Sequence, residues 1–171
     1  MKTSRALAFL VAAIPAVALA KGPPPPQNNP GLANYADDHL SFAYPKALRS
    51  ITVSDDRSKA ECKSEDGKSK LTIDAIPRPL EGGVVGVLEK RLPGGGGVDG
   101  DWGEWKCREG NIDGGAARQV ICGRKMKDDA EAIIIASLKA PVKAFAKMNA
   151  RKMLRDILRT LVGFKAEGAE Q

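Results

Sequence analysis

Apolar side chains recur at helical spacing through the last part of the chain, from Pro141 to Phe164. The positions that define this stripe are Val142, Ala146, Ala150, Met153, Leu154, Ile157 and Leu161. Such spacing is typical of an amphipathic helix with one buried face. Pro141 suits the first turn of a helix and Gly163 suits the residue just after its end, so the pattern predicts one long C-terminal helix.

Most of the remaining chain favours β-structure. Short runs that alternate apolar and polar residues, or are rich in β-branched residues, predict strands between turn-forming residues. The predicted strands are His39–Pro45, Ser50–Val53, Lys59–Lys63, Lys70–Ile76, Gly103–Glu109, Ala116–Arg124 and Glu131–Leu138. A short helix is predicted at Gly83–Leu92. This order predicts an α+β domain: an antiparallel β-sheet covered by a short helix and a long C-terminal helix, in an α/β/α sandwich-like arrangement.

The first twenty residues have the pattern of a secretory signal peptide. Lys2 and Arg5 precede an apolar segment, and Ala18-Leu19-Ala20 has the small-x-small pattern that signal peptidase recognises. We therefore expect cleavage between Ala20 and Lys21 and a soluble periplasmic or secreted product. Because no cysteine directly follows the cleavage site, a lipoprotein is not expected, and no later apolar run has the length of a membrane span.

The segment after the predicted cleavage site is rich in proline, with four consecutive prolines at positions 23–26. Such a sequence favours an extended conformation without a sheet ladder. The predicted organisation is therefore a signal peptide (1–20), a Pro-rich linker or disordered tail (21–34), a single α+β domain (35–164) and a disordered C-terminal tail (165–171).

The net charge does not indicate a nucleic-acid partner. The chain has 27 basic and 21 acidic residues, a formal net charge of +6, which falls to +4 when Lys2 and Arg5 are removed with the signal peptide. Nucleic-acid-binding proteins normally have denser basic clusters with interleaved aromatic residues. A mildly basic exported domain is therefore expected to have another kind of partner.

The three cysteines predict one disulfide. Asp113-Gly114-Gly115-Ala116 is a natural hairpin turn. If Asp113 and Ala116 are the pair that flanks it, the residue numbers of every cross-strand pair have the same sum, and the numbers of Cys107 and Cys122 also have this sum. These two cysteines then lie opposite each other on neighbouring strands, in a chain predicted to be exported to an oxidising compartment. Cys62 is left over, either as a redox or intermolecular thiol or, as we favour, as a small buried apolar residue.

Catalytic chemistry has few candidates in this sequence. His39 is the only histidine, and no nucleophile motif accompanies it. The single His and the absence of C-x-x-C argue against a zinc site, and we expect no metal, no cofactor and no catalytic residues. The one acidic cluster, Asp99, Asp101 and Glu104 beside two tryptophans, leaves a small hydrolase as the alternative.

The best candidate for a binding surface is the predicted terminal helix together with the tryptophan loop. The candidate residues are Phe145, Met148, Arg151, Lys152, Arg155, Arg159, Trp102 and Trp105. An exposed Phe145 or Met148 among arginines would suit an acidic protein partner or an anionic membrane surface. If these two side chains are buried, they belong to the core and the basic face is a solvated helix surface.

The order of elements resembles one known family. The opening His39-Leu-Ser-Phe-Ala-Tyr-Pro45, the following strands and short helix, and a closing helix ending in RDILRTLVGF are similar to the PsbP/Mog1/DcrB-like group of α/β/α sandwich domains, over about residues 35–164. The resemblance implies a non-catalytic binding module, and no functional residue carries over from it.

Together these patterns favour a non-catalytic exported module that binds a protein of the cell envelope, such as an inhibitor, immunity-type or accessory protein. The alternatives are the hydrolase above and a peripheral binder of anionic membrane surfaces. The oligomeric state is not predicted.

Overall fold

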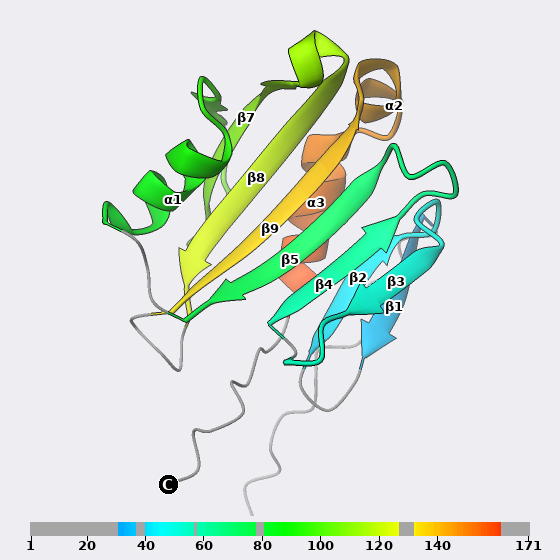
Figure 1. Ribbon diagram of the computed structural model, residues 1–171, viewed down its shortest axis with the longest axis horizontal. Coiled ribbons are helices and arrows are strands. Elements are labelled where there is room, and N and C mark those ends of the chain that lie inside the picture. The colour runs from blue at the N-terminus through cyan, green and yellow to red at the C-terminus, as the bar shows by residue number, and fades with distance from the viewer. Residues whose placement is uncertain (1–30, 37–39, 57, 78–80, 127–131, 162–171) are drawn as a thin grey trace, which may run out of the picture.

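The computed structural model of the chain describes residues 31–36, 40–56, 58–77, 81–126 and 132–161 (Figure 1). The predicted signal peptide with its cleavage site, residue His39 and the predicted tail 165–171 lie outside the described residues.

The centre of the fold is a seven-stranded sheet in the order β3-β4-β5-β9-β8-β7-β6, in which every neighbouring pair is antiparallel. Its strands are β3 (Ser50–Val53), β4 (Lys59–Lys63), β5 (Lys70–Ile76), β6 (Gly96–Gly97), β7 (Lys106–Ile112), β8 (Ala117–Lys125) and β9 (Ile133–Pro141). β9 is rich in isoleucine and lies in the middle of the order, as expected for a strand covered on both faces.

A separate two-stranded hairpin joins β1 (Leu32–Ala36) to β2 (Ser41–Pro45). β1 begins inside the segment 21–34 that the sequence predicts to be a linker or tail. Its Leu32 is buried, and Tyr35 packs against Phe42 of β2 with ring centroids 5.4 Å apart. The domain therefore begins a few residues earlier than the alternating pattern indicates.

Each face of the central sheet contributes to a separate apolar core. On one face, α1 (Gly83–Arg91) buries Val87 and Leu88 against Ile121, Ile133 and Ile135. On the other face, α2 (Val142–Lys147), α3 (Ala150–Thr160) and the β1–β2 hairpin enclose the larger core. Figure 1 shows α1 in front of β7 and β8, whereas α2 and α3 lie behind the sheet.

The predicted fold class is wrong in its balance of elements. Strands form 45% and helices 24% of the structure, so the protein is mostly β, with only short helices, rather than a sandwich with a long C-terminal helix. In place of one long helix across residues 141–164, the structure has α2 with 6 residues and α3 with 11.

The break between α2 and α3 lies at Asn149, which adopts a left-handed conformation with φ +50° and ψ +58°. Asparagine tolerates this conformation better than most residues, and one such residue ends a right-handed helix. The break also changes which side chains face inward. Val142, the first member of the predicted stripe, is 40% exposed, whereas Phe145 is 6% exposed and belongs to the core.

The predicted disulfide is confirmed. Cys107 Sγ and Cys122 Sγ are 2.05 Å apart, and the two residues are directly paired between β7 and β8. The connection differs from the predicted two-residue turn: pairing ends at Ile112 and Ala117, and a 3-10 turn (Asp113–Gly115) lies between them. The loop is longer than predicted by one residue on each side. The sum of the residue numbers in each cross-strand pair is therefore unchanged, and Cys107 still pairs with Cys122.

Candidate functional site

The loop between β6 and β7 carries both tryptophans of the chain. Gly100 and Gly103 have positive φ angles of 112° and 59°, which allow tight turns on either side of Trp102. The Trp102 indole Nε1 donates to the Asp99 carbonyl oxygen at 3.4 Å, and its side chain is only 8% exposed. The loop is therefore held by Trp102, which inserts into the larger core, while Trp105 stays half-buried.

Each tryptophan has an arginine from another element over its ring. The Arg155 guanidinium of α3 lies 4.6 Å from the ring centroid of Trp102, and that of Arg124 of β8 lies 5.0 Å from that of Trp105. Both distances are within the range of a cation–π interaction. The loop, the helix and the strand thus meet at one place, which brings together Trp102, Trp105 and Arg155 of the predicted binding residues.

The surface around these residues is hollowed. A groove of about 260 Å³ between the loop and α3 is lined by Asp101, Trp102, Gly103, Glu104, Trp105, Arg155, Leu158 and Arg159. A second hollow of about 700 Å³ extends from the same loop toward α1, where Val85 is 49% exposed. We call Val85, Trp102, Trp105, Arg124, Arg155 and Arg159 together the tryptophan surface.

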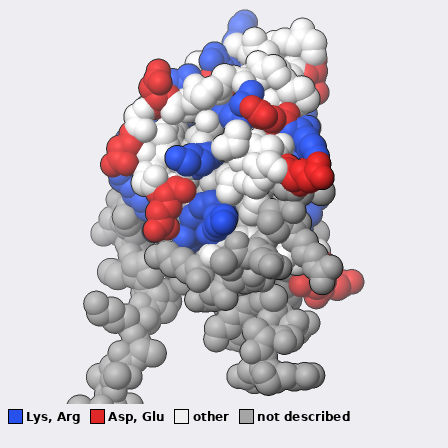
Figure 2. Space-filling model, turned by 90° about the vertical axis from the view of Figure 1, so that its left-hand side faces the viewer, with Lys and Arg blue, Asp and Glu red and all other residues white. Residues whose placement is uncertain are grey.

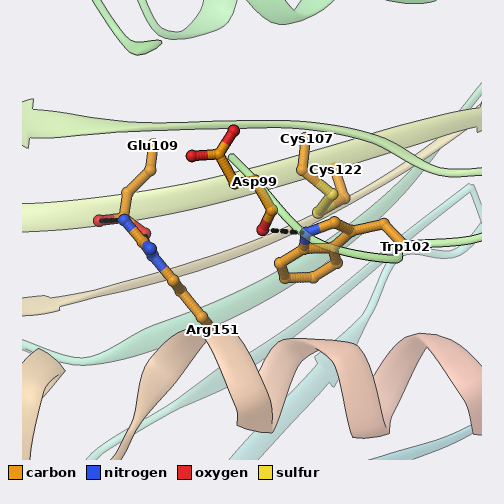
Figure 3. Close-up of a disulfide and its surroundings, with 6 residues drawn as sticks. All are labelled: Asp99, Trp102, Cys107, Glu109, Cys122 and Arg151. Carbon is orange, nitrogen blue, oxygen red and sulfur yellow. Dashed lines mark hydrogen bonds and ion pairs between the residues drawn. A yellow bond between two sulfur atoms is a disulfide. The ribbon is translucent and has the colours of Figure 1, made fainter. Parts of the chain in front are cut away.

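On the same side of the sheet as α3 lies a buried carboxylate that sequence reasoning missed. The side chain of Glu109 on β7 is 4% exposed and accepts hydrogen bonds from Arg151 Nε and Nη2 at 2.5 and 3.2 Å (Figure 3). Arg118 Nη2 of β8 lies 2.6 Å from the same carboxylate. The hydrogen bond to Glu109 raises the pKa of Arg151, so this guanidinium is committed to an internal ion pair that joins α3 to the sheet.

The other predicted residues of the helix face are also placed by internal contacts. Phe145 is buried, with the Arg118 guanidinium 5.9 Å from its ring centroid, and Met148 is half-buried against the larger core. Lys152 Nζ is 2.8 Å from Asp156, and Arg159 Nη1 is 3.9 Å from the same carboxylate. Phe145 and Met148 therefore belong to the core, and Arg151 and Lys152 are engaged in ion pairs.

The acidic loop does not concentrate its carboxylates in one reaction site. Asp101 Oδ1 accepts a hydrogen bond from the Gly103 backbone N–H at 2.9 Å, and Glu104 pairs with Arg124 at 3.3 Å. Asp99 lines the larger hollow and lies near Arg151, with which it interacts electrostatically (Figure 3). In the part of the chain that the structure describes, no group of His, Cys, Asp and Glu has the arrangement of a metal site.

Cys62 lies in the larger core, fully buried and unpaired by any disulfide. Burial raises the pKa of its thiol to about 12. The interpretation of Cys62 as a buried apolar residue is confirmed, and such a thiol is a poor nucleophile.

Charges of both signs are interleaved on the side of the molecule that carries α1, where Figure 2 shows uncharged surface between them. Among the helices that the structure describes, none combines the length and the apolar character that a membrane span requires.

No protein-family model and no curated protein matches this chain. A crystal structure of a protein from Bacteroides thetaiotaomicron is similar, with a TM-score of 0.46 and 16% sequence identity. The similarity covers 77% of this chain and 47% of that chain, so this chain spans about half the length of that protein. The resemblance to the PsbP/Mog1/DcrB-like group stays a prediction.

Proposed function

We propose that this chain is a non-catalytic, exported module that binds a protein of the cell envelope, as an inhibitor, immunity-type or accessory protein. The tryptophan surface is the proposed contact site. The observation that carries the proposal is the convergence of two tryptophans and three arginines beside a groove of about 260 Å³. Tryptophan and arginine are the residues most enriched at the energetic centres of protein interfaces, and a groove can accept a side chain of the partner.

Export is supported by the cross-strand disulfide, because such bonds persist in oxidising compartments. The N-terminal pattern that predicts a signal peptide points in the same direction.

The proposal is tested by capture of partners from an envelope extract with the mature domain. Trp105→Ala combined with Arg159→Ala removes the half-buried Trp105 ring and the exposed Arg159 side chain, and keeps Trp102, which anchors the loop. Lys143→Ala combined with Lys147→Ala, on exposed positions of α2, is the matched control. We expect one partner to bind the wild type and the control equally, and the tryptophan-surface variant about tenfold or more weakly in calorimetry with the purified partner. Equal affinity for all three proteins would overturn the proposal.

The alternative of a small hydrolase rests on Asp99 and Asp101, which line the hollow of about 700 Å³ beside Trp102. Asp99→Asn, Asp101→Asn and Glu104→Gln together distinguish the two functions. Partner binding that survives this triple change, together with unchanged biological activity, supports the binding module. Loss of activity with partner binding intact supports the hydrolase.

A further inference from the structure

Three lysines lie in one row across the central sheet. In the strand register, Lys63 of β4 is directly opposite Lys70 of β5, and Lys70 is directly opposite Lys139 of β9. Since neighbouring strands are about 4.8 Å apart, this lysine row spans about 10 Å perpendicular to the strands. Ser50 of β3 and Gln119 of β8 continue the row at its two ends.

The lysine row points away from the larger core. On the same strands, Cys62, Leu71 and Leu138 are the neighbouring residues that face that core, so the lysines face the opposite side of the sheet. α1 covers this side over β7, β8, the isoleucines of β9 and the end of β5, where Ile76 packs with the α1 cluster and Arg91 pairs with Asp74. Figure 1 shows that, among the described residues, no element lies in front of β4 and β5.

Like charges directly opposite each other destabilise a sheet, and this arrangement is only partly compensated. Glu61 lies 2.9 Å from Lys63 Nζ and 3.4 Å from Lys70 Nζ, but it also lies 2.9 Å from Lys59 Nζ. Asp113 pairs with Lys139 at 2.8 Å. The same face also carries Asp74, which lies directly opposite Lys59 and pairs with Arg91 of α1, so four lysines and Arg91 share three carboxylates. The lysine side chains remain between 33% and 49% exposed, so their ammonium groups are accessible to a ligand.

Apart from Glu61, the side chains beside the lysine row are uncharged hydrogen-bonding groups. Thr52, Thr72 and Ser137 follow one another in the next row of the register, on either side of Glu61. All described aromatic side chains, by contrast, pack with the larger core on the other side of the sheet. The open face therefore presents ammonium, hydroxyl and amide groups with fewer carboxylates and, among the described residues, no aromatic side chain.

The side chains on this face favour one class of anionic ligand over the others. Single-stranded nucleic acids are bound through stacking on aromatic side chains, and membrane-surface helices insert apolar side chains. Energetic centres of protein interfaces are depleted in lysine. A linear anionic polysaccharide matches the face best, because it presents regularly spaced carboxylates to the lysines and hydroxyl groups to Thr72, Ser137 and Gln119. The positive charge of the lysines attracts the carboxylates of the polymer, and the hydroxyl and amide groups form hydrogen bonds with its hydroxyl groups.

We propose that the open face of β4, β5 and β9, centred on Lys63, Lys70 and Lys139, binds a linear anionic polysaccharide. This site lies on the opposite side of the sheet from the groove at α3, so it is independent of the protein partner proposed above. A module of this kind can hold a protein partner at α3 while its other face is attached to an acidic carbohydrate polymer.

The test measures binding of the mature domain to polygalacturonate, with neutral dextran as the uncharged polymer. Lys63→Gln, Lys70→Gln and Lys139→Gln together remove the row, while Lys90→Gln, Lys143→Gln and Lys147→Gln remove the same charge from exposed positions on α1 and α2. At about 0.1 M ionic strength, where the Debye length is about 10 Å, we expect the row variant to bind about tenfold or more weakly, and the control to change by less than about threefold. Replacement of the row by three arginines keeps the charge and should restore binding.

Equal weakening in the row and control variants would overturn the proposal, because net charge alone would then explain binding. The proposal would also be overturned if the wild-type protein did not bind polygalacturonate, or if it bound dextran equally well. Vesicles of equal parts phosphatidylglycerol and phosphatidylcholine form the lipid arm: stronger row-dependent binding there than to polygalacturonate would assign the face to a membrane. Far-UV circular dichroism checks folding, and if the triple change unfolds the domain, Lys70→Gln alone should still weaken binding.

Discussion

Replacing Glu109 by glutamine tests whether the buried carboxylate holds α3 against the sheet. Glu109 lies on β7, and its partners Arg118 and Arg151 come from β8 and α3. Glutamine keeps the size of the side chain, removes the negative charge and replaces one acceptor oxygen by a donor. Two guanidinium groups are then left beside an amide that cannot accept all of their hydrogen bonds.

The size of the effect follows from how exposed each group is. Breaking a fully buried ion pair costs about 3–5 kcal/mol. Here the Glu109 side chain is 4% exposed, but those of Arg151 and Arg118 are 51% and 43% exposed, so both arginines can regain water. We therefore expect Glu109→Gln to lower the free energy of unfolding by about 2 kcal/mol. The matched control is Glu104→Gln, because the Glu104 side chain is 71% exposed in its pair with Arg124 and should cost less than about 0.5 kcal/mol.

Urea denaturation of the disulfide-bonded protein measures both variants. With a slope of about 2 kcal/mol/M, the midpoint of Glu109→Gln should fall by about 1 M while the slope stays the same. A double-mutant cycle with Arg151→Gln should give a coupling of about 1 kcal/mol. If Glu109→Gln is no more costly than Glu104→Gln, or if the coupling is zero, the carboxylate does not hold the helix and the reasoning fails.

Other predictions concern pH, oxidation state and the helix break. Hydrogen bonds from Lys59 and Lys63, with the charge of Lys70, lower the pKa of Glu61 from 4.5 to about 2. Ionised Glu61 should therefore contribute about 1–2 kcal/mol to the free energy of unfolding, after allowing for the exposure of the lysines. This contribution should be complete above pH 4.5 and lost as the pH falls toward 2. In acid titrations of stability, the Glu61→Gln variant should lack this loss. Reduction of Cys107–Cys122 should destabilise by about 3 kcal/mol in thermal unfolding, and an unchanged midpoint would contradict this. Cys62 should react with a thiol reagent only after unfolding, since its pKa is raised to about 12; rapid labelling of the folded protein would refute this. Asn149→Gly should be neutral or stabilising and Asn149→Ala should cost about 1 kcal/mol, because φ at this residue is +50°; the reverse order in urea melts would argue against the left-handed break.

Local patterns in the sequence predict the strands well because their signals are local. Alternation between apolar and polar residues, bounded by turn-forming residues, predicts β4 and β5 with their observed bounds. The cross-strand disulfide follows from the same kind of reasoning, since pairing across a hairpin depends only on the centre of its turn. Both successes concern segments that are adjacent in the chain.

The terminal helix could not be predicted in the same way. Its apolar residues match helical spacing on both sides of Asn149, so the periodicity alone contains no sign of the break. The left-handed residue lets α2 and α3 bury different sides, and Phe145 moves from the predicted polar face into the core. Whether a helix continues through such a residue is decided by packing against the sheet, which periodicity does not describe.

The candidate surfaces depend on which strands are neighbours. Glu109 is one acid in an alternating strand, and it becomes an internal ion pair only because β8 and α3 bring Arg118 and Arg151 to it. Because Arg151 is engaged in this ion pair, it is not available on the helix face that the sequence predicts to bind a partner.

The charges on the two sides of the sheet are compensated differently, and that difference indicates where ligands bind. On the α3 side, a buried carboxylate is matched by two arginines, and two further arginines lie over tryptophan rings. On the open side, lysines that are distant in the chain are placed next to one another by the register and share too few carboxylates. A stable sheet does not require that row, since uncharged polar residues would avoid the repulsion. Like charges that lie next to one another without full compensation are expected at functional surfaces, so the row is a stronger indication of an anionic ligand than the net charge of the chain.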